Sequence, residues 1–196
     1  RNPVKVYKYD YVNNVKDTLY TFKDIRHIHF IQEDICDYDS VYIGTGDFDK
    51  ECGIYKFNIK NKSINKVGGG SQLWRAVSIV QIDGYLYWGT DDPDGQNFII
   101  KYDFTNAKLQ KLKHIEGPAY YSAKTKNNVM YIATTIEDRK KHRAIIYKSI
   151  DGKRWTEVIE FKKDIFHTKY FGYGVVEFIN KQEKINDIYY NLEGLK

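Results

Sequence analysis

Long apolar runs are missing from this sequence of 196 residues, and cysteine is scarce. No apolar stretch approaches the roughly 18 residues that a membrane-spanning helix needs, so we expect no membrane partner. Two cysteines, Cys36 and Cys52, are too few for a disulfide framework, and their spacing matches no zinc motif. Because they flank one predicted strand at opposite ends, we expect two thiols that are not bonded to each other.

A strong excess of one charge is also missing. The chain has 31 basic and 26 acidic residues, with a formal net charge of +5. The lysines are spread along the sequence, whereas a nucleic-acid face needs basic residues concentrated on one surface together with stacking aromatic rings. We therefore expect a solvated, lysine-rich surface and no nucleic-acid partner.

Aromatic residues and a repeated phrase are what the sequence does have. It contains 18 Tyr, 10 Phe and 3 Trp, which favour strands, whereas Leu and Ala are few for a helical protein. The segment 41–47 returns at 86–92 and, more loosely, at 130–136, with spacings of 45 and 44 residues. Strand-like phrases repeated at this period are typical of propeller blades. We predict an all-β fold, a β-propeller of four-stranded antiparallel blades.

The strands expected around this phrase divide the chain into three blade units and two flanking pieces. The blade units cover about residues 26–67, 74–112 and 119–159, and the terminal strands lie within 4–22 and 172–190. Inside these ranges, residues 74–81 are expected as an inner strand and 185–190 as the last strand. A single domain of about four blades results if the terminal strands complete one sheet; the alternative is a run of blades from a larger propeller.

A propeller would place the starts of its inner strands and the loops after the repeated phrase on one face, around the central channel. Carboxylates beside Arg, with Tyr and Trp walls, suit a sugar, and two carboxylates about 5–9 Å apart could serve glycoside hydrolysis. The catalytic candidates are Asp47, Asp91 and Tyr120. The candidates for ligand binding are Arg26, His27, His29, Asp49, Glu51, Trp74, Arg75, Trp88, Asp92 and Tyr121.

Metal and phosphate motifs are weak. His27 and His29 lie on one side of a predicted strand, and with Asp47 or Asp91 they offer ligands that suit several divalent ions. Such a pair is more often packed and hydrogen-bonded, so we expect no cofactor and keep the two histidines as weak metal candidates. The acidic segment 47–51 does not continue as a calcium-binding EF-hand loop. The glycines at 68–70 do not form a phosphate loop and instead allow a tight turn or a close approach to a ligand.

One segment resembles a known family motif. Residues 149–155, Ser-Ile-Asp-Gly-Lys-Arg-Trp, resemble the Asp-box, or BNR repeat, of sialidase-like propellers, one residue shorter and without its Thr. The segments 26–30, 44–47, 69–78 and 117–122 are similar to uncharacterised microbial members of that family. The resemblance implies a structural box on the face away from the site. Sialidases use an Arg triad, a Tyr/Glu pair and an Asp acid. Arg26 and Arg75 lie on predicted inner strands, where two of these arginines would fit, and neither a third Arg nor the Arg-Ile-Pro phrase of the family is identified.

The sequence therefore predicts a glycan-binding or glycan-processing propeller, possessing a site on the face of the central channel that takes a carbohydrate or another small polar ligand. The alternative is a non-catalytic scaffold that presents its rim to a protein partner.

Overall fold

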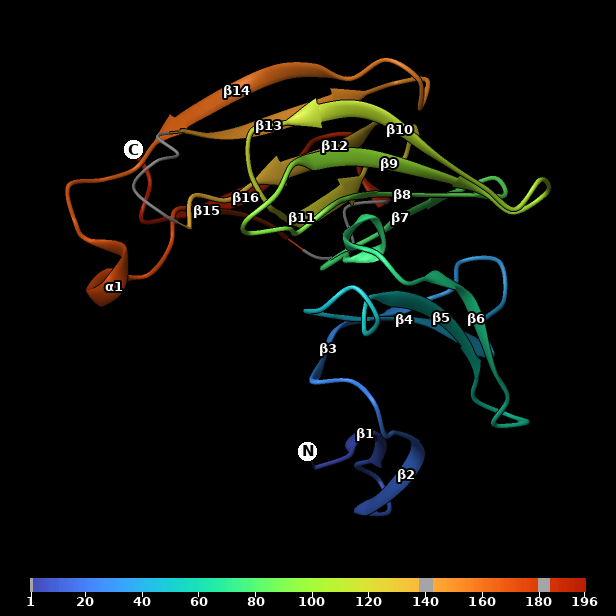
Figure 1. Cartoon of the computed structure of the whole chain (residues 1–196). Coiled ribbons are helices and arrows are strands. Elements are labelled where there is room, and N and C mark those ends of the chain that lie inside the picture. The colour runs from blue at the N-terminus through green and yellow to red at the C-terminus, as the bar shows by residue number, and fades with distance from the viewer. Residues whose placement is uncertain (1, 138–142, 180–183) are drawn as a thin grey trace. The chain divides into compact units, whose positions relative to one another are not determined.

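The computed structural model describes residues 2–137, 143–179 and 184–196 (Figure 1). Strands dominate these ranges, and the helical elements are single turns, η1 (Gln72–Trp74) and α1 (Thr168–Phe171). The predicted all-β class is confirmed. No helix in the described ranges has the length and apolarity that crossing a membrane requires. The chain forms two compact units, Arg1–Arg75 and Ala76–Lys196, each of which has its own sheets.

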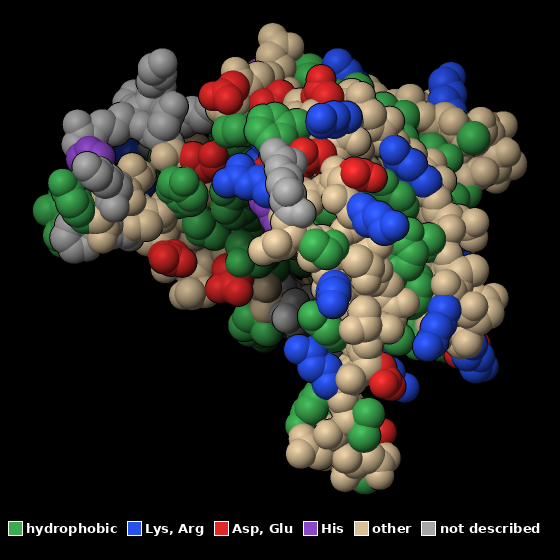
Figure 2. All heavy atoms as spheres, turned by 60° about the horizontal axis from the view of Figure 1, so that its bottom comes forward, with side chains coloured by type: hydrophobic (Ala, Val, Ile, Leu, Met, Phe, Trp, Pro, Cys, Tyr) green, Lys and Arg blue, Asp and Glu red, His purple; other side chains and the backbone are tan. Residues whose placement is uncertain are grey.

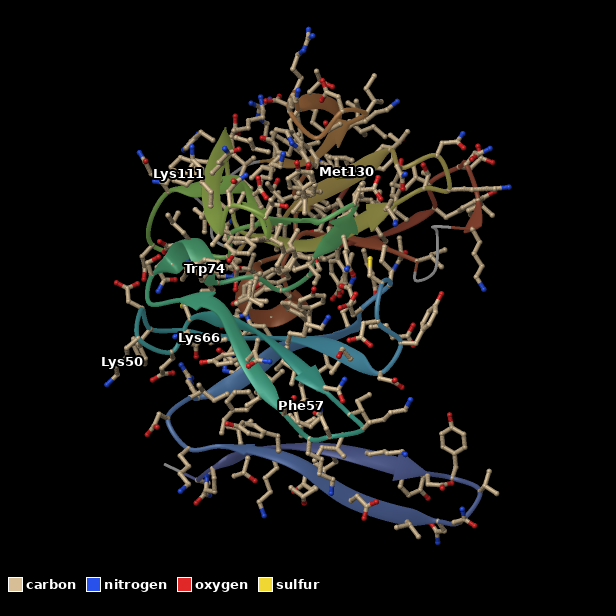
Figure 3. The ribbon with its side chains drawn as sticks, turned by 90° about the vertical axis from the view of Figure 1, so that its right-hand side faces the viewer. Lys50, Phe57, Lys66, Trp74, Lys111 and Met130 are labelled. Atoms are coloured by element: carbon tan, nitrogen blue, oxygen red, sulfur yellow. The ribbon has the colours of Figure 1, made fainter. Side chains whose placement is uncertain are left out.

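Over its described residues, 2–75, the first unit contains a two-stranded hairpin and one four-stranded antiparallel sheet. Its strands are β1 (Val4–Asp10), β2 (Val15–Phe22), β3 (His27–Glu33), β4 (Ser40–Gly46), β5 (Gly53–Asn58) and β6 (Ile64–Gly69). The hairpin packs on the sheet through Val6 and Phe22, which meet Ile43 and Phe57 in one buried cluster. Phe57, labelled in Figure 3, is fully buried in that core. The alternation of apolar and polar residues along β1 and β5 accounts for this one-sided packing.

The second unit contains two four-stranded antiparallel sheets and one two-stranded sheet, in the part of the unit that the structure describes. Its strands are β7 (Val80–Ile82), β8 (Tyr85–Gly89), β9 (Asn97–Asp103), β10 (Lys108–Ile115), β11 (Ala119–Lys124), β12 (Met130–Thr134), β13 (Arg143–Ser149), β14 (Thr156–Lys162), β15 (Val175–Phe178) and β16 (Tyr190–Glu193). One buried cluster joins the β7–β10 sheet to the β11–β14 sheet through residues such as Ile99, Ile132 and Trp155. A second joins β12 and β13 to Val176 and Phe178 of β15.

The repeated phrase has a structural explanation in its threonine. Thr45, Thr90 and Thr134 follow a Gly or Ala at the end of β4, β8 and β12, and all three are buried. Each hydroxyl ties its strand to the start of the next one along the chain. Thr45 Oγ1 donates to the Glu51 carbonyl at 2.7 Å, Thr90 Oγ1 accepts from the Phe98 N–H at 2.9 Å, and Thr134 Oγ1 accepts from the Ile145 N–H at 2.8 Å. In all three sheets the buried hydroxyl therefore has a backbone partner near the start of the next strand, a carbonyl for Thr45 and an N–H for Thr90 and Thr134.

The hairpins that end the blade units share their turn chemistry. Asp10, Asn58 and Asp103 each close a turn by accepting backbone N–H groups two and three residues ahead. In the β13–β14 turn Asp151 does the same for Lys153 and Arg154, and Ser149 Oγ accepts the Gly152 N–H. The Asp-box-like segment is therefore built as a turn, and the matching chemistry of β1–β2 gives that hairpin the character of the outer half of a blade.

Two predicted strands differ from the structure. Within 74–81, only Val80 and Gln81 belong to β7, because Gln72–Trp74 forms the η1 turn and Ala76 makes an isolated bridge to Thr90. The last strand is β16, Tyr190–Glu193, instead of 185–190. Residues 185–187 bend, and the Ile185 carbonyl accepts the N–H of Lys126 at 2.7 Å, so pairing with β15 starts later along the chain.

The thiols and the surface charges agree with expectation. Cys36 is exposed, Cys52 is buried and both are free thiols. Figure 2 shows Lys and Arg side chains spread among other types across the visible face instead of gathered in one patch.

Candidate functional site

The first unit concentrates its polar side chains around Asp47, at the end of β4. Asp47 has a φ of 148°, in the region that L-residues rarely adopt. Gln72 Nε2 and Arg75 Nη1 both donate to its backbone carbonyl, at 2.9 and 3.2 Å. These two bonds, from residues that follow β6, hold the unusual backbone in place.

Four cationic or imidazole groups surround the Asp47 carboxylate. Arg26 Nη1 lies 3.2 Å and His27 Nδ1 3.3 Å from Oδ2, whereas Arg75 Nη2 lies 3.4 Å and His29 Nε2 3.6 Å from Oδ1. We call Arg26, His27, His29, Asp47, Gln72 and Arg75 the Asp47 cluster. Because its members come from the start of β3, the end of β4 and the turn after β6, the predicted convergence of these positions holds within this unit.

The two histidines differ in their exposure. Their rings stack with centroids 4.5 Å apart and planes 5° from parallel. The His27 side chain is 49% exposed and that of His29 only 4%. Burial lowers the pKa of His29 to about 4, and the nearby charges of His27 and Arg75 lower it too. His29 is therefore a neutral imidazole near pH 7, while His27 and the 63% exposed Arg26 face solvent.

The other acids of the β4–β5 loop have structural partners. Glu51 is buried, and its carboxylate accepts the N–H of Arg26 at 3.1 Å. Asp49 accepts a hydrogen bond from Gln72 Nε2 at 3.0 Å. Both acids thus fix the loop and the start of β3. Burial raises the pKa of the neighbouring Cys52 thiol.

Trp74 lies at the end of η1 and is half-buried (Figure 3). Its ring covers Gly68, where an added Cβ would stand 2.1 Å from the indole. The glycines of this segment therefore make room for an aromatic ring of the chain itself, and Gly70, with a φ of 97°, supplies the turn.

An open depression lies beside the Asp47 cluster. It has a volume of about 430 Å³ and is lined by Asn2, Ile25, Arg26 and Phe48. Arg26 belongs both to this depression and to the cluster. Phe48 directly follows Asp47 and is 52% exposed, so the depression joins an exposed aromatic ring to a guanidinium group.

The remaining predicted residues belong to the second unit, and one of them is not placed for ligand contact. Trp88 is 0% exposed and lies in the core, at the same place in the repeated phrase as Ile43 and Ile132. Because no face of the indole reaches solvent, we remove Trp88 from the candidate site. Because Ile43 and Ile132 are apolar, the repeat itself already indicated that Trp88 packs in the core.

The acids of the β8–β9 loop in the second unit are also engaged. Asp92 Oδ1 accepts the N–H groups of Asp94 and Gly95, and Asn97 closes the loop through the Asp92 N–H and carbonyl. Asp91 is buried. Asp92 is consequently a turn residue.

The two tyrosines of β11 are half-buried. Tyr120 donates to Glu137 Oε1 at 2.6 Å, and burial together with this bond raises the pKa of Tyr120. Tyr121 packs at the edge of the cluster around Val176. The candidates named from the sequence do not include Glu137, the partner of Tyr120, or Gln72 and Phe48 in the first unit.

Comparison with known proteins identifies the fold. No family model matches the sequence, and no curated protein matches it significantly. Among solved structures, TolB from Acinetobacter baumannii superposes with a TM-score of 0.59 at 11% identity, over 96% of this chain and 48% of that one. The extracellular domain assigned to a hybrid two-component system of B. thetaiotaomicron superposes with a TM-score of 0.57 at 9% identity, over 95% of this chain and 29% of that one.

Both of these structures are β-propeller proteins, and the chain has a β-propeller fold. It spans less than half of the length of either structure. At these identities the likeness concerns the fold alone.

Proposed function

We propose that this propeller binds a carbohydrate without transforming it, in the depression beside the Asp47 cluster. The observation that carries the proposal is the pairing of Phe48 with Arg26 in that depression. Sugars present a face of C–H groups that packs on an aromatic ring and an edge of hydroxyls that needs hydrogen-bond donors and acceptors.

The depression offers both kinds of contact. Phe48 is exposed enough to receive the face of a ring, and Ile25 adds apolar atoms to the lining of the depression. Arg26 contributes N–H donors, with its guanidinium oriented by Asp47 at 3.2 Å, and Asn2 contributes an amide. A site of this kind needs few groups, provided that they are held in place before the ligand arrives.

Binding is favoured over hydrolysis by the state of the nearby acids. Hydrolysis needs one carboxylic acid and one carboxylate that face the same bond. In this loop Asp47 is surrounded by cationic and imidazole groups, Asp49 accepts from Gln72, and Glu51 holds the start of β3. Each acid is already committed to the fold of the loop, which supports a binding role.

The resemblance of residues 149–155 to the Asp-box of sialidase-like propellers is in keeping with the same ligand class. Arg26 and Arg75 both approach the site, but Arg75 is mostly buried and is bonded to Asp47. In this proposal Arg26 contacts the ligand, and Arg75 positions Asp47.

The test is a glycan array with neutral and sialylated glycans, followed by calorimetric titration with the strongest binder. Phe48→Ala and Arg26→Ala should each weaken binding by about tenfold or more, as expected for central contacts. The matched control is Tyr38→Ala, which removes a 91% exposed aromatic side chain from the β3–β4 loop and should leave affinity unchanged. Absence of glycan binding, or equal losses in all three variants, would contradict the proposal.

A protein-binding scaffold is the second candidate, and the β1–β2 hairpin favours it. Tyr9, Tyr11 and Val12 are 54%, 83% and 87% exposed at its tip. Contiguous exposed apolar side chains are a common mark of an interaction surface. A protein that binds nothing on the glycan array would favour this candidate over the first.

A further inference from the structure

We propose that His27, His29 and Asp47 form a binding site for a divalent transition-metal ion of the zinc type. The site shares Asp47 and Arg26 with the carbohydrate proposal, but metal binding can be measured without any sugar. The three side chains each offer one ligand atom, and these atoms all lie within 4.8 Å of one another.

The distances between the ligand atoms fit tetrahedral coordination. With metal–ligand bonds near 2.1 Å, neighbouring ligand atoms of a tetrahedral zinc ion are about 3.4 Å apart. His27 Nδ1 lies 3.3 Å from Asp47 Oδ2, and His29 Nε2 lies 3.6 Å from Asp47 Oδ1. The two imidazoles contact different oxygens of the carboxylate, so binding of one ion by all three side chains requires a side-chain rotation.

The backbone holds these ligands in advance. His27 and His29 alternate along β3, so their side chains leave the strand on the same side. Their rings stack 5° from parallel, so one ring must turn about its side-chain bonds before both nitrogens point at one ion. The positive φ of Asp47 is fixed by the bonds from Gln72 and Arg75 to its carbonyl. The backbone of the site is therefore in place before binding, and side-chain rotation completes the coordination.

The two arginines have different roles in this proposal. Arg26 is 63% exposed and competes with a cation for Asp47 Oδ2, but it can swing into solvent. Arg75 is 15% exposed and donates to the other oxygen and to the carbonyl. Metal-ligating carboxylates are commonly held by such a donor behind them.

The ligand set selects the ion. Two imidazole nitrogens and one carboxylate oxygen suit zinc, copper or nickel, whereas calcium and magnesium prefer oxygen ligands. Three protein ligands leave a fourth position for water or a ligand oxygen. His27, which is 49% exposed, marks the side on which that position faces solvent.

The test is calorimetric titration of chelator-treated protein with zinc chloride and, in parallel, with magnesium chloride. We expect one zinc ion per chain and no comparable magnesium binding. His27→Gln should weaken zinc binding by about tenfold or more. His114→Gln is the matched control, because it removes an exposed histidine of β10 that is not in the cluster, and it should bind zinc as the unaltered protein does.

Arg26→Ala gives a second and opposite readout. Removal of the competing guanidinium should strengthen zinc binding several-fold, a result that loss of structure cannot produce. Circular dichroism of each variant verifies the fold. The proposal is overturned if no zinc binds, if magnesium binds equally well, if His27→Gln and His114→Gln behave alike, or if Arg26→Ala weakens binding. Glycan titration in the presence of the chelator keeps this result separate from the carbohydrate proposal.

Discussion

The loop after β4 and the loop after β8 begin with the same phrase and use it differently. Both follow a Gly-Thr pair whose hydroxyl joins two strands. Asp47 and Asp92 then occupy the same place in the repeat. Asp47 lies among two arginines and two histidines, whereas Asp92 accepts N–H groups of its own turn.

This difference arises from the neighbours that each loop meets. Asp47 is flanked by His27 and His29 of the adjacent β3 and by Arg75 after β6. In the second unit, Asn97 fills the space after Thr90 and bonds the loop to itself. A repeat therefore conserves the residues that join strands, while the chemistry at the loop depends on side chains that the repeat does not specify.

The largest effect is expected at the paired core positions, Ile43 and Trp88. Both are fully buried. Trp88→Ala should lower the free energy of unfolding by about 3–5 kcal/mol and Ile43→Ala by about 2–5 kcal/mol, because each leaves a cavity. Urea denaturation measures both. A Trp88→Ala protein of unchanged stability would remove the reason for placing this residue in the core.

The equivalent acids Asp47 and Asp92 should differ clearly in their contribution to stability. Asp47→Asn keeps the shape but removes the charge that faces the mostly buried Arg75, so we expect a loss of about 2 kcal/mol in unfolding free energy. Asp92→Asn keeps an oxygen for the Asp94 and Gly95 N–H groups and should change stability by less than about 0.5 kcal/mol. Equal changes in unfolding free energy, measured by guanidinium denaturation, would mean that Asp47 and Asp92 have the same structural role.

The shared threonines should behave alike. Thr45→Val and Thr90→Val preserve volume but remove a buried hydroxyl that holds the start of the next strand. Each should cost about 1–2 kcal/mol, since buried polar groups lose their partner. The free energies of unfolding of the two variants are the measurement, and a large cost in only one would show that the phrase is not structurally equivalent in the two units.

The smallest effect is expected in the hairpin turns. Lys62 and Ala107 have φ values of 57° and 49°, in the left-handed region. Lys62→Gly and Ala107→Gly should each raise stability by up to about 1 kcal/mol, because glycine adopts this conformation without a Cβ clash. Thermal unfolding would detect the gain. A decrease in both melting temperatures would argue against the shared turn geometry.

The sequence predicts most of the strand order because each sheet follows the period of the repeated phrase. The blade unit predicted to start at residue 119 does start there, with β11 (Ala119–Lys124). The misplaced strands are those where local chemistry competes with pairing: Gln72–Trp74 closes a short turn, and 185–187 bends before β16 begins. The alternation of apolar and polar residues, taken alone, does not predict such turns.

The positions of the site residues could also be predicted in part from the period of the repeated phrase. Arg26, His27, His29, Asp47 and Arg75 meet because topology places strand starts and loop ends together. Gln72 and the positive φ of Asp47 decide the final geometry, and neither has a sequence signature.

The most direct test of the difference between the two loops is the affinity of the strongest array glycan for Asp47→Asn and Asp92→Asn, measured by calorimetry. Asp47 orients Arg26 beside the depression, so Asp47→Asn should weaken binding by about tenfold. Asp92→Asn should bind as the unaltered protein does, because Asp92 serves its own turn. Unchanged affinity in Asp47→Asn, or an equal loss in Asp92→Asn, would contradict the assignment of ligand binding to the first loop.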